Sequence, residues 1–196
     1  MNMETSMIPN KLNPHNSFSK EQITTGFSKI FTIDNAISEE SAADLLTYGK
    51  ANVVAANNKH NHNFSIHVNT CFLPLDHPVH LELQAAWATA IDFYKFDISF
   101  IEPYELKHYP LGGHYSRHID NYHAMDIPVD RKISMTLQLS ESIDYDGGDL
   151  NVVYKNISRK RLSMNFFPSF YPHGINAVTR GNRWVLIGWA WGPYWH

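Results

Sequence analysis

Cysteine and long apolar runs are both scarce in this chain. Its single cysteine, Cys71, cannot form an internal disulfide, and its apolar neighbours in "NTCFLPL" indicate a packing residue. No stretch approaches the roughly 20 apolar residues that cross a bilayer. The opening "MNMETSMIPNKLNPHN" lacks the charged-then-apolar order of a secretory signal. We therefore expect a cytoplasmic protein with no membrane partner.

The net charge is also small, which argues against nucleic acid as a partner. The 16 basic and 19 acidic residues leave a formal charge of -3, so no electrostatic footprint for nucleic acid is present. The short basic run "RKR" at 159–161 reads as a solvated hairpin end. At 196 residues, the chain suits one domain, because a domain of this size buries roughly 70% of its unfolded surface.

The order of segments predicts a tail followed by one domain. Residues 1–26 read as an N-terminal tail, residues 27–99 as a helical support and residues 100–196 as a β-rich core. "IFTI" indicates a strand. "NAISEESAADLLTYGKA" indicates a helix with Ser38 as N-cap. In "HLELQAAWATAIDFYKF", Leu83, Trp87, Ile91 and Tyr94 recur at helical spacing.

After Phe100 the chain changes to short segments with strand character. Seven of them are separated by Gly, Pro, Asp and Asn: "YELKHY", "HYSRHID", "RKISMTLQLS", "DLNVVY", "RLSMNFF", "HGINAVT" and "RWVLIGWAW". Seven strands close together predict a β-sandwich or a jelly roll. "YDGGDL" and "TRGN" are the clearest hairpin turns, because glycine supplies the positive φ that tight turns need.

"RHID" places His118 and Asp120 two residues apart. On a strand, such side chains share one face and can converge inside a barrel. The pair alone is weak evidence, because an H-x-D sequence is common by chance. His173 would complete two imidazoles and a carboxylate, which is the ligand set of non-haem iron(II) oxygenases. A structural zinc site would favour four closed ligands that include cysteine.

Arg183 follows His173 by ten residues across a glycine-containing turn. Its guanidinium can bind a carboxylate through two parallel hydrogen bonds, as the distal end of 2-oxoglutarate would require. If these strands form a hairpin, His173 and Arg183 face one interior only when the loop has an odd number of residues. We therefore expect a three-residue loop, "RGN", with Gly181 left-handed and Thr179 opposite Arg183.

Four segments in order resemble one known family. "HYPLGGHYSRHID", "RKISMTLQLS", "DYDGGDL" and "FPSFYPHGINAVTRGNRWVLIGW" resemble the iron(II)- and 2-oxoglutarate-dependent dioxygenases, in particular the prolyl 4-hydroxylase-like branch. The resemblance covers about residues 27–193. It implies a mainly β fold in which a double-stranded β-helix, or jelly-roll, core is flanked by N-terminal α-helices.

The resemblance also assigns roles to six residues. It makes His118, Asp120 and His173 the iron ligands and catalytic centre, and Arg183 the anchor for the distal carboxylate. It also implies that Tyr109 helps to hold 2-oxoglutarate and that Trp189 lines the pocket, although an ordinary core tryptophan is an equal alternative. The implied cofactors are Fe(II) and 2-oxoglutarate, with ascorbate as a reductant, and dioxygen as co-substrate.

The implied reaction is hydroxylation of an unactivated C–H bond, in a prolyl or other residue of a peptide or protein. Two alternatives stay open: a hydroxylase of a free amino acid or small metabolite, and a jelly-roll binding module without turnover. His108, His114 and His123 lie near the motif but read as pocket rim or surface. The polar segment 55–69 reads as a loop that covers the site, or as plain surface loop.

Overall fold

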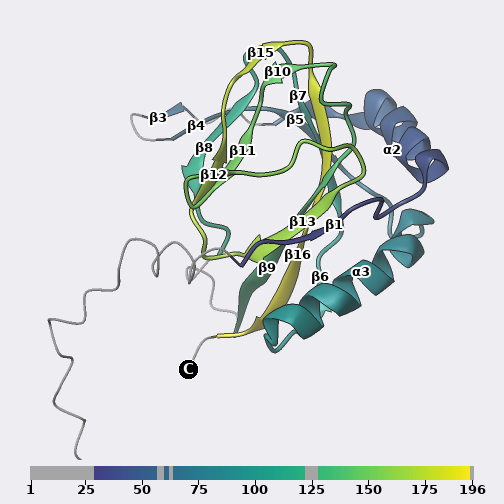
Figure 1. Ribbon diagram of the computed structural model, residues 1–196, viewed down its shortest axis with the longest axis vertical. Helices are drawn as coiled ribbons and strands as arrows, with labels where there is room; N and C mark the ends of the chain where they lie inside the picture. The colour runs from purple at the N-terminus through teal and green to yellow at the C-terminus, as the bar shows by residue number, and fades with distance from the viewer. Residues whose placement is uncertain (1–28, 57–59, 62–63, 122–127, 195–196) are drawn as a thin grey trace, which may run out of the picture.

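The computed structural model describes residues 29–56, 60–61, 64–121 and 128–194, and the side chains at 60–61 are not described. The predicted tail, His123 and part of the predicted loop 55–69 lie outside these residues. Two antiparallel sheets face each other, and two helices pack on the outer side of the larger one (Figure 1). This is the expected mainly β architecture with supporting helices.

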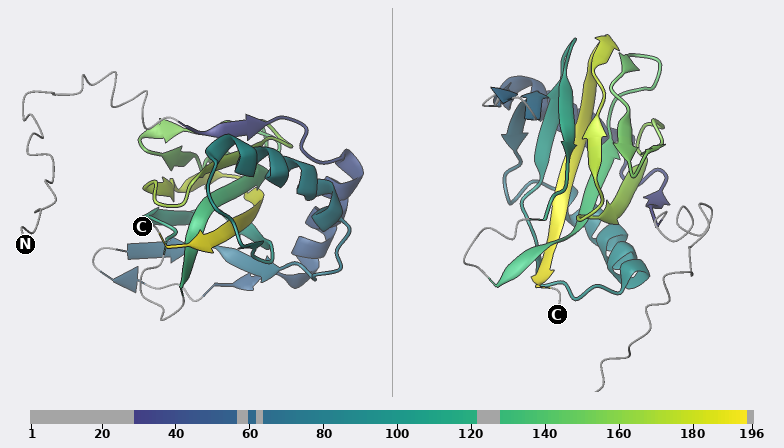
Figure 2. Two further views of the ribbon diagram at one scale, coloured as in Figure 1. Left: turned by 90° about the horizontal axis from the view of Figure 1, so that it is seen from below. Right: turned by 90° about the vertical axis from the view of Figure 1, so that its left-hand side faces the viewer.

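The larger sheet has eight strands in the order β1-β13-β9-β16-β7-β5-β2, with β6 paired to β16. Its strands are β1 (Phe31–Ile33), β13 (Met164–Pro168), β9 (Val129–Gln138), β16 (Arg183–Pro193), β7 (Glu105–Tyr109), β5 (Asn69–Phe72), β2 (Val54–Ala55) and β6 (Phe100–Ile101). Strand β16 lies at the centre, between β7 and β9 (Figure 2). It therefore contributes side chains to the middle of the space between the sheets.

The smaller sheet has six strands in the order β12-β11-β14-β8-β4-β3. Its strands are β12 (Lys155–Asn156), β11 (Leu150–Val152), β14 (His173–Ile175), β8 (His114–His118), β4 (Phe64–His67) and β3 (His60–Asn61). A separate pair, β10 (Asp146–Gly147) and β15 (Val178–Arg180), closes one end. Strands β8 and β14 are neighbours, and His118 lies opposite His173 in their register.

The two predicted helices form where the sequence indicated them. Helix α2 (Glu39–Asn52) begins at Ser38, whose hydroxyl accepts a hydrogen bond from the Ser41 backbone N–H. Helix α3 (Val79–Tyr94) buries the predicted face with Leu83, Trp87 and Tyr94. Both helices pack on the outer face of the larger sheet, so its inner face is left for the site.

The N-terminal part is more than a helical support, which corrects the expectation for residues 27–99. Strand β1 forms at the predicted "IFTI" segment. Beyond that expectation, β2 and β5 extend the larger sheet, and β3 and β4 extend the smaller one. The interpretation of 55–69 as loop was wrong for residues 64–67, which pair with β8. The strand "FSIH" alternates apolar and polar residues, but it follows a polar segment and its pairing partner lies far along the chain.

The expected hairpin between His173 and Arg183 is absent from the described strands. Strand β15 pairs with β10, while Arg183 on β16 lies opposite Tyr109, not Thr179. Gly181 is left-handed at φ 66°, as predicted, and an added Cβ would lie 2.0 Å from the Asp144 carbonyl oxygen. The turn is thus a corner that carries the chain between sheets. The "YDGGDL" turn also joins strands that do not pair with each other.

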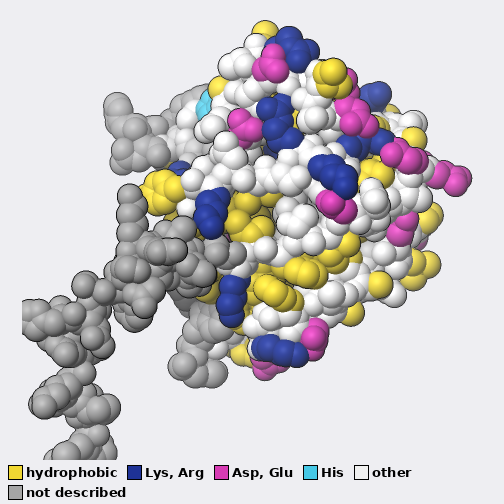
Figure 3. Space-filling model, in the orientation of Figure 1, with side chains coloured by type: hydrophobic (Ala, Val, Ile, Leu, Met, Phe, Trp, Pro, Cys, Tyr) yellow, Lys and Arg dark blue, Asp and Glu magenta, His cyan; other side chains and the backbone are white. Residues whose placement is uncertain are grey.

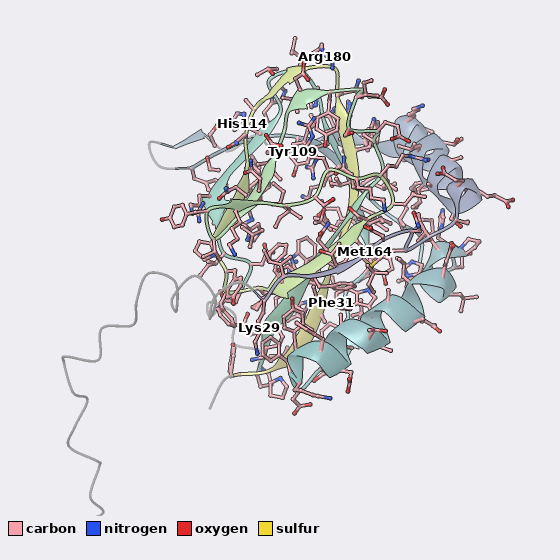
Figure 4. The ribbon with its side chains drawn as sticks, in the orientation of Figure 1. Lys29, Phe31, Tyr109, His114, Met164 and Arg180 are labelled. Carbon is pink, nitrogen blue, oxygen red and sulfur yellow. The ribbon has the colours of Figure 1, made fainter. Side chains whose placement is uncertain are left out.

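Most of the buried apolar side chains lie between the helices and the larger sheet. Trp87 of α3 packs edge-on against Phe166 of β13, with ring centroids 5.0 Å apart. Phe31 stacks on Phe166 as well, and Figure 4 shows Phe31 beside Met164 above α3. Cys71 packs against this cluster while partly buried. A separate cluster around Tyr109 and Tyr145 lies between the sheets.

Charged side chains of both signs alternate over the face seen in Figure 3, without a large patch of one sign. Among the residues that the structure describes, no helix is both long and apolar enough to cross a membrane.

Leu83→Ala should lower the free energy of unfolding by about 2–5 kcal/mol, because it leaves a cavity at a fully buried position. The matched control is Leu81→Ala on the same helix, where the side chain is 72% exposed; it should change stability by less than about 0.5 kcal/mol. Urea unfolding measures both. Equal effects would contradict the assignment of the buried face.

Candidate active site

Three potential metal ligands meet at one end of the space between the sheets. The side-chain ligand atoms of His118, Asp120 and His173 all lie within 4.8 Å of one another. His118 ends β8, His173 begins β14, and Asp120 lies two residues beyond the end of β8. The Asp120 backbone N–H donates to the Ser169 carbonyl oxygen at 2.8 Å, which fixes this residue after the strand ends.

Both histidines present Nε2 to the carboxylate. The Nδ1 atom of His118 lies 2.8 Å from the Ser116 carbonyl oxygen, and that of His173 lies 2.9 Å from the Tyr171 carbonyl oxygen. Because a carbonyl oxygen only accepts, each Nδ1 carries the proton, and Nε2 of the neutral ring has a free lone pair. The Nε2 atoms lie 3.4 and 3.3 Å from the Asp120 oxygens.

Asp120 is only 6% exposed, so its charge needs compensation. Burial by itself raises the pKa of Asp120, but its contacts with His118 and His173 outweigh burial and hold the pKa well below its usual value. Burial lowers the pKa of His173, and the Asp120 contact more than reverses this. A carboxylate facing two Nε2 lone pairs needs either protons or a cation among them. This donor set therefore fits a divalent metal ion.

Two further donors orient the carboxylate. The Ser134 hydroxyl donates to Asp120 Oδ2 at 2.6 Å, and the Trp189 indole N–H donates to the same oxygen at 2.8 Å. Oδ1 receives neither of these bonds. Trp189 was expected to line the pocket or to be an ordinary core residue; its side chain lines the cavity and also holds a candidate ligand. Ser134 was not predicted.

Arg183 lies farther along the same inner face of β16. It is 4% exposed, its Nε donates to the Gln138 side-chain oxygen at 3.2 Å, and its Nη1 has no hydrogen-bond partner among the described residues. A buried guanidinium with an unused N–H is suited to a carboxylate ligand. The sequence did not predict a role for Gln138, whose side-chain amide also donates to the Tyr145 hydroxyl at 2.9 Å.

Tyr109 lies opposite Arg183, with the guanidinium carbon 5.4 Å from its ring centroid. Burial raises the pKa of its phenol, although Arg183 opposes this shift. The hydroxyl therefore stays protonated and can donate a hydrogen bond. Tyr109 is buried, and Figure 4 shows it among the strands of the two sheets. The structure thus brings Tyr109 and Arg183 together at one end of the space.

A single cavity of about 300 Å³ joins these groups, and all six predicted site residues line it. The wall also contains charged residues that sequence reasoning missed, Glu105, Lys107 and Arg131. Arg131 forms a two-fold hydrogen-bonded pair with Glu102 at 3.0 and 2.7 Å and lies 3.7 Å above the Trp189 ring. The period of two in "YELKHY" could have predicted Glu105 and Lys107, because on a strand it places both residues on the same face as Tyr109.

Two other histidines near the motif, His108 and His114, stay outside the triad. His108 stacks on Trp184 and contacts Asn69 and Asn182 on the outer face of β7. His114 lies 2.8 Å from the Ser65 hydroxyl, at the edge formed by β4. Neither belongs to the metal-ligand group, in agreement with their interpretation as rim or surface residues.

Fold and site together define a class: a double-stranded β-helix that holds two histidines and a carboxylate between its sheets, with an arginine at the far end. Comparison with known proteins agrees. Residues 104–191 match the family described as the 2OG-Fe(II) oxygenase superfamily. The β-rich part of the chain is therefore similar to this superfamily, and the overall fold is like that of the prolyl 4-hydroxylases.

Similar proteins include two curated relatives and a solved structure. A PKHD-type hydroxylase of Saccharophagus degradans is 28% identical over 187 residues, covering 89% of this chain and 75% of that protein. Another from Idiomarina loihiensis is 35% identical over 89 residues, covering 43% and 40%. The viral collagen prolyl hydroxylase of Paramecium bursaria Chlorella virus-1, solved with 2OG, has a TM-score of 0.66 at 17% identity, covering 83% and 96%.

The matches to the first curated relatives span 40% or less of those proteins' length.

Trp189→Phe should weaken divalent metal binding by about 10-fold or more, because it removes a hydrogen bond that orients a ligand while keeping an aromatic ring. The matched control is Trp191→Phe on the same strand, whose indole N–H donates to Glu102 instead. Anaerobic titration with Mn(II), followed by electron paramagnetic resonance, gives the dissociation constants. Unchanged affinity in Trp189→Phe would show that this bond does not support the metal site.

Proposed function

We propose that the protein is an iron(II)- and 2-oxoglutarate-dependent hydroxylase of an unactivated C–H bond. The observation that carries this proposal is the joint placement of two kinds of unsatisfied group in one cavity. At one end are two imidazole lone pairs and a carboxylate that need a cation. At the other is a buried arginine N–H that needs an acceptor.

His118, Asp120 and His173 would hold Fe(II), which leaves part of the coordination sphere open for exchangeable ligands. When bound, Fe(II) and 2-oxoglutarate supply the oxidative chemistry, in which dioxygen converts the keto acid to succinate and carbon dioxide and hydroxylates the substrate. The protein fixes the ligands: backbone carbonyls orient both imidazoles, while Ser134 and Trp189 orient Asp120. Ascorbate as reductant stays a prediction.

Arg183 and Tyr109 would hold the far end of 2-oxoglutarate. The guanidinium is preoriented by Gln138, so little side-chain freedom is lost when a carboxylate binds. The protonated Tyr109 hydroxyl can add a hydrogen bond. Because both groups are buried, these bonds form in a medium of low dielectric constant, where they are stronger than in water.

The substrate belongs to one of two classes. The prolyl hydroxylase fold of the viral enzyme supports the first, a prolyl or other residue within a peptide. The charged inner wall formed by Glu105 and Lys107 favours the second, a free amino acid. An alternative function is that of a jelly-roll binding module without turnover. The presence of all three candidate metal ligands and of Arg183 argues against it. A cytoplasmic location also stays a prediction.

Anaerobic addition of Fe(II) and then 2-oxoglutarate should produce a visible charge-transfer band, and air should then convert 2-oxoglutarate to succinate. Arg183→Met should keep metal binding but weaken 2-oxoglutarate binding by about 100-fold, because truncating a buried charge pair costs roughly 2–5 kcal/mol.

The matched control is Arg180→Met in the same turn, since Arg180 pairs with Asp146 at 2.7 Å on the outside. Figure 4 places Arg180 at the end of the molecule, away from the cavity. Arg180→Met should bind 2-oxoglutarate like the wild type. A wild-type protein that gives no band would favour the binding module. Equal binding by the two arginine variants would remove Arg183 from its assigned role.

A further inference from the structure

An ion pair occupies the inner wall of the cavity. Glu105 and Lys107 are on β7, with Lys107 Nζ 3.1 Å from Glu105 Oε2 and side chains 12% and 11% exposed. The Thr70 hydroxyl donates to the other Glu105 oxygen. The apolar residues that line the same cavity include Ala56, Ile66, Val68, Val185 and Ile187.

This ion pair is not required by the fold. Removing two charges from water costs several kcal/mol per ion, and apolar residues of similar volume in place of a buried pair are often neutral or stabilising. The neighbouring inner positions of β16 are Val185 and Ile187, so the strand accepts apolar residues there. A charged pair that faces a cavity rather than a packed core is suited to recognition of a ligand.

The pair lies close to the metal ligands. Val185 is opposite Lys107 and Ile187 is opposite Glu105, while Trp189, two residues farther along β16, contacts Asp120. On the facing sheet, Lys107 Nζ is 5.5 Å from the Tyr115 ring centroid, and that ring is 4.4 Å from the ring of His118. A molecule bound to the pair would therefore lie beside the triad.

The other charged groups of the cavity already have partners, so Glu105 and Lys107 are available to bind the substrate. The two negative charges of 2-oxoglutarate and that of Asp120 would be balanced by Fe(II) and Arg183. Arg131 is engaged by Glu102 through two hydrogen bonds. Lys107 and Glu105 remain as one positive and one negative group. A carboxylate oxygen can accept more than one hydrogen bond, and an ammonium has three N–H donors, so each can take a further partner.

We propose that Glu105 and Lys107 bind the zwitterionic backbone of a free α-amino acid, whose carboxylate contacts Lys107 and whose ammonium group contacts Glu105. This inference rests on the proposed function and selects its substrate class. A zwitterion adds no net charge to the cavity. An internal residue of a peptide has neither charge, and would leave both buried groups without a ligand while displacing their water.

Four forms of one amino acid, which differ only in the charges of the backbone groups, test the proposal. L-Proline, N-acetyl-L-proline, L-prolinamide and N-acetyl-L-prolinamide, with the same four forms of L-leucine and L-glutamine, are titrated by calorimetry into the full chain loaded anaerobically with Mn(II) and 2-oxoglutarate. For at least one side chain, the zwitterion should bind about 10-fold more tightly than either singly blocked form. The doubly capped form should bind most weakly.

Variants assign each charge to its residue. In Lys107→Met, the free amino acid and its amide should bind within about 3-fold of each other; in Glu105→Gln, the free amino acid and its N-acetyl form should do so. Both variants should bind 2-oxoglutarate like the wild type. The double variant Glu105→Gln, Lys107→Met removes both charges. Its thermal unfolding midpoint should be at or above that of the wild type, which would show that the variant loses binding without losing its fold.

Three results would overturn the proposal. The first is that no zwitterion in the panel binds better than its capped form, and the second is that the preference for the zwitterion survives in both single variants. The third is that Lys107→Met weakens 2-oxoglutarate binding. The last result would assign Lys107 to the co-substrate. Failure of the wild-type protein to bind Mn(II) and 2-oxoglutarate would instead reject the proposed function. The two failures are therefore distinguishable, because 2-oxoglutarate binding is measured before any amino acid is added.

Discussion

A buried carboxylate, that of Asp120, is the constraint on which this structure depends. Its environment raises the free energy of a lone negative charge, so the surrounding residues must supply compensation. The Ser134 hydroxyl and the Trp189 indole N–H donate to it from β9 and β16, and the two imidazoles from β8 and β14 complete a site for a cation. The ends of β8 and β14 must be adjacent for this, and the β8–β14 pairing of the smaller sheet makes them so. The jelly-roll arrangement is what brings the four strands together.

The rest of the cavity follows from period-two alternation on the central strands. On β9, Ile133 and Leu137 pack in the core under the helices, while Ser134 and Thr136 line the cavity. On β16, Arg183 and Trp189 face inward, and Leu186 packs toward α3. Each strand thus has an apolar side that stabilises the fold and a polar side that builds the site. The helices cover one side of the larger sheet, so the polar side can be used for binding.

The polar groups of the cavity are distributed according to charge. Asp120 with its two histidines attracts a cation at one end, and Arg183 attracts an anion at the other. Between them, Glu105 and Lys107 form a pair with no net charge. An elongated dianion that also binds the metal would satisfy both ends. A second ligand would then meet a wall that carries both signs, which is unlike the apolar surface expected for a buried proline ring.

Local patterns predicted the two helices and the strand segments after Phe100, except that "HGINAVT" divides into β14 and β15 of different sheets. The triad was indicated by the family resemblance, and the structure places its three side chains together. Ser38 is followed by acidic residues and a helical repeat, so its capping role depends on near neighbours only. His118 and Asp120 are also neighbours. By contrast, the strand at residues 64–67 is only four residues long and is stabilised by β8, about 50 residues away, so its short alternation was not recognised as a strand. The roles of Ser134 and Gln138 likewise depend on distant partners.

The expected hairpin shows the same limit. Gly181 was correctly predicted to be left-handed, because a glycine turn is a local property. The partner of Arg183 was not predictable in this way, since Tyr109 reaches it only through pairing of β7 with β16. By itself, the amino-acid sequence determined which side chains could bind a metal and a carboxylate, and which segments could be strands or helices. Only the tertiary structure decided which of them meet, because strand pairing and burial are set by residues far apart in the chain.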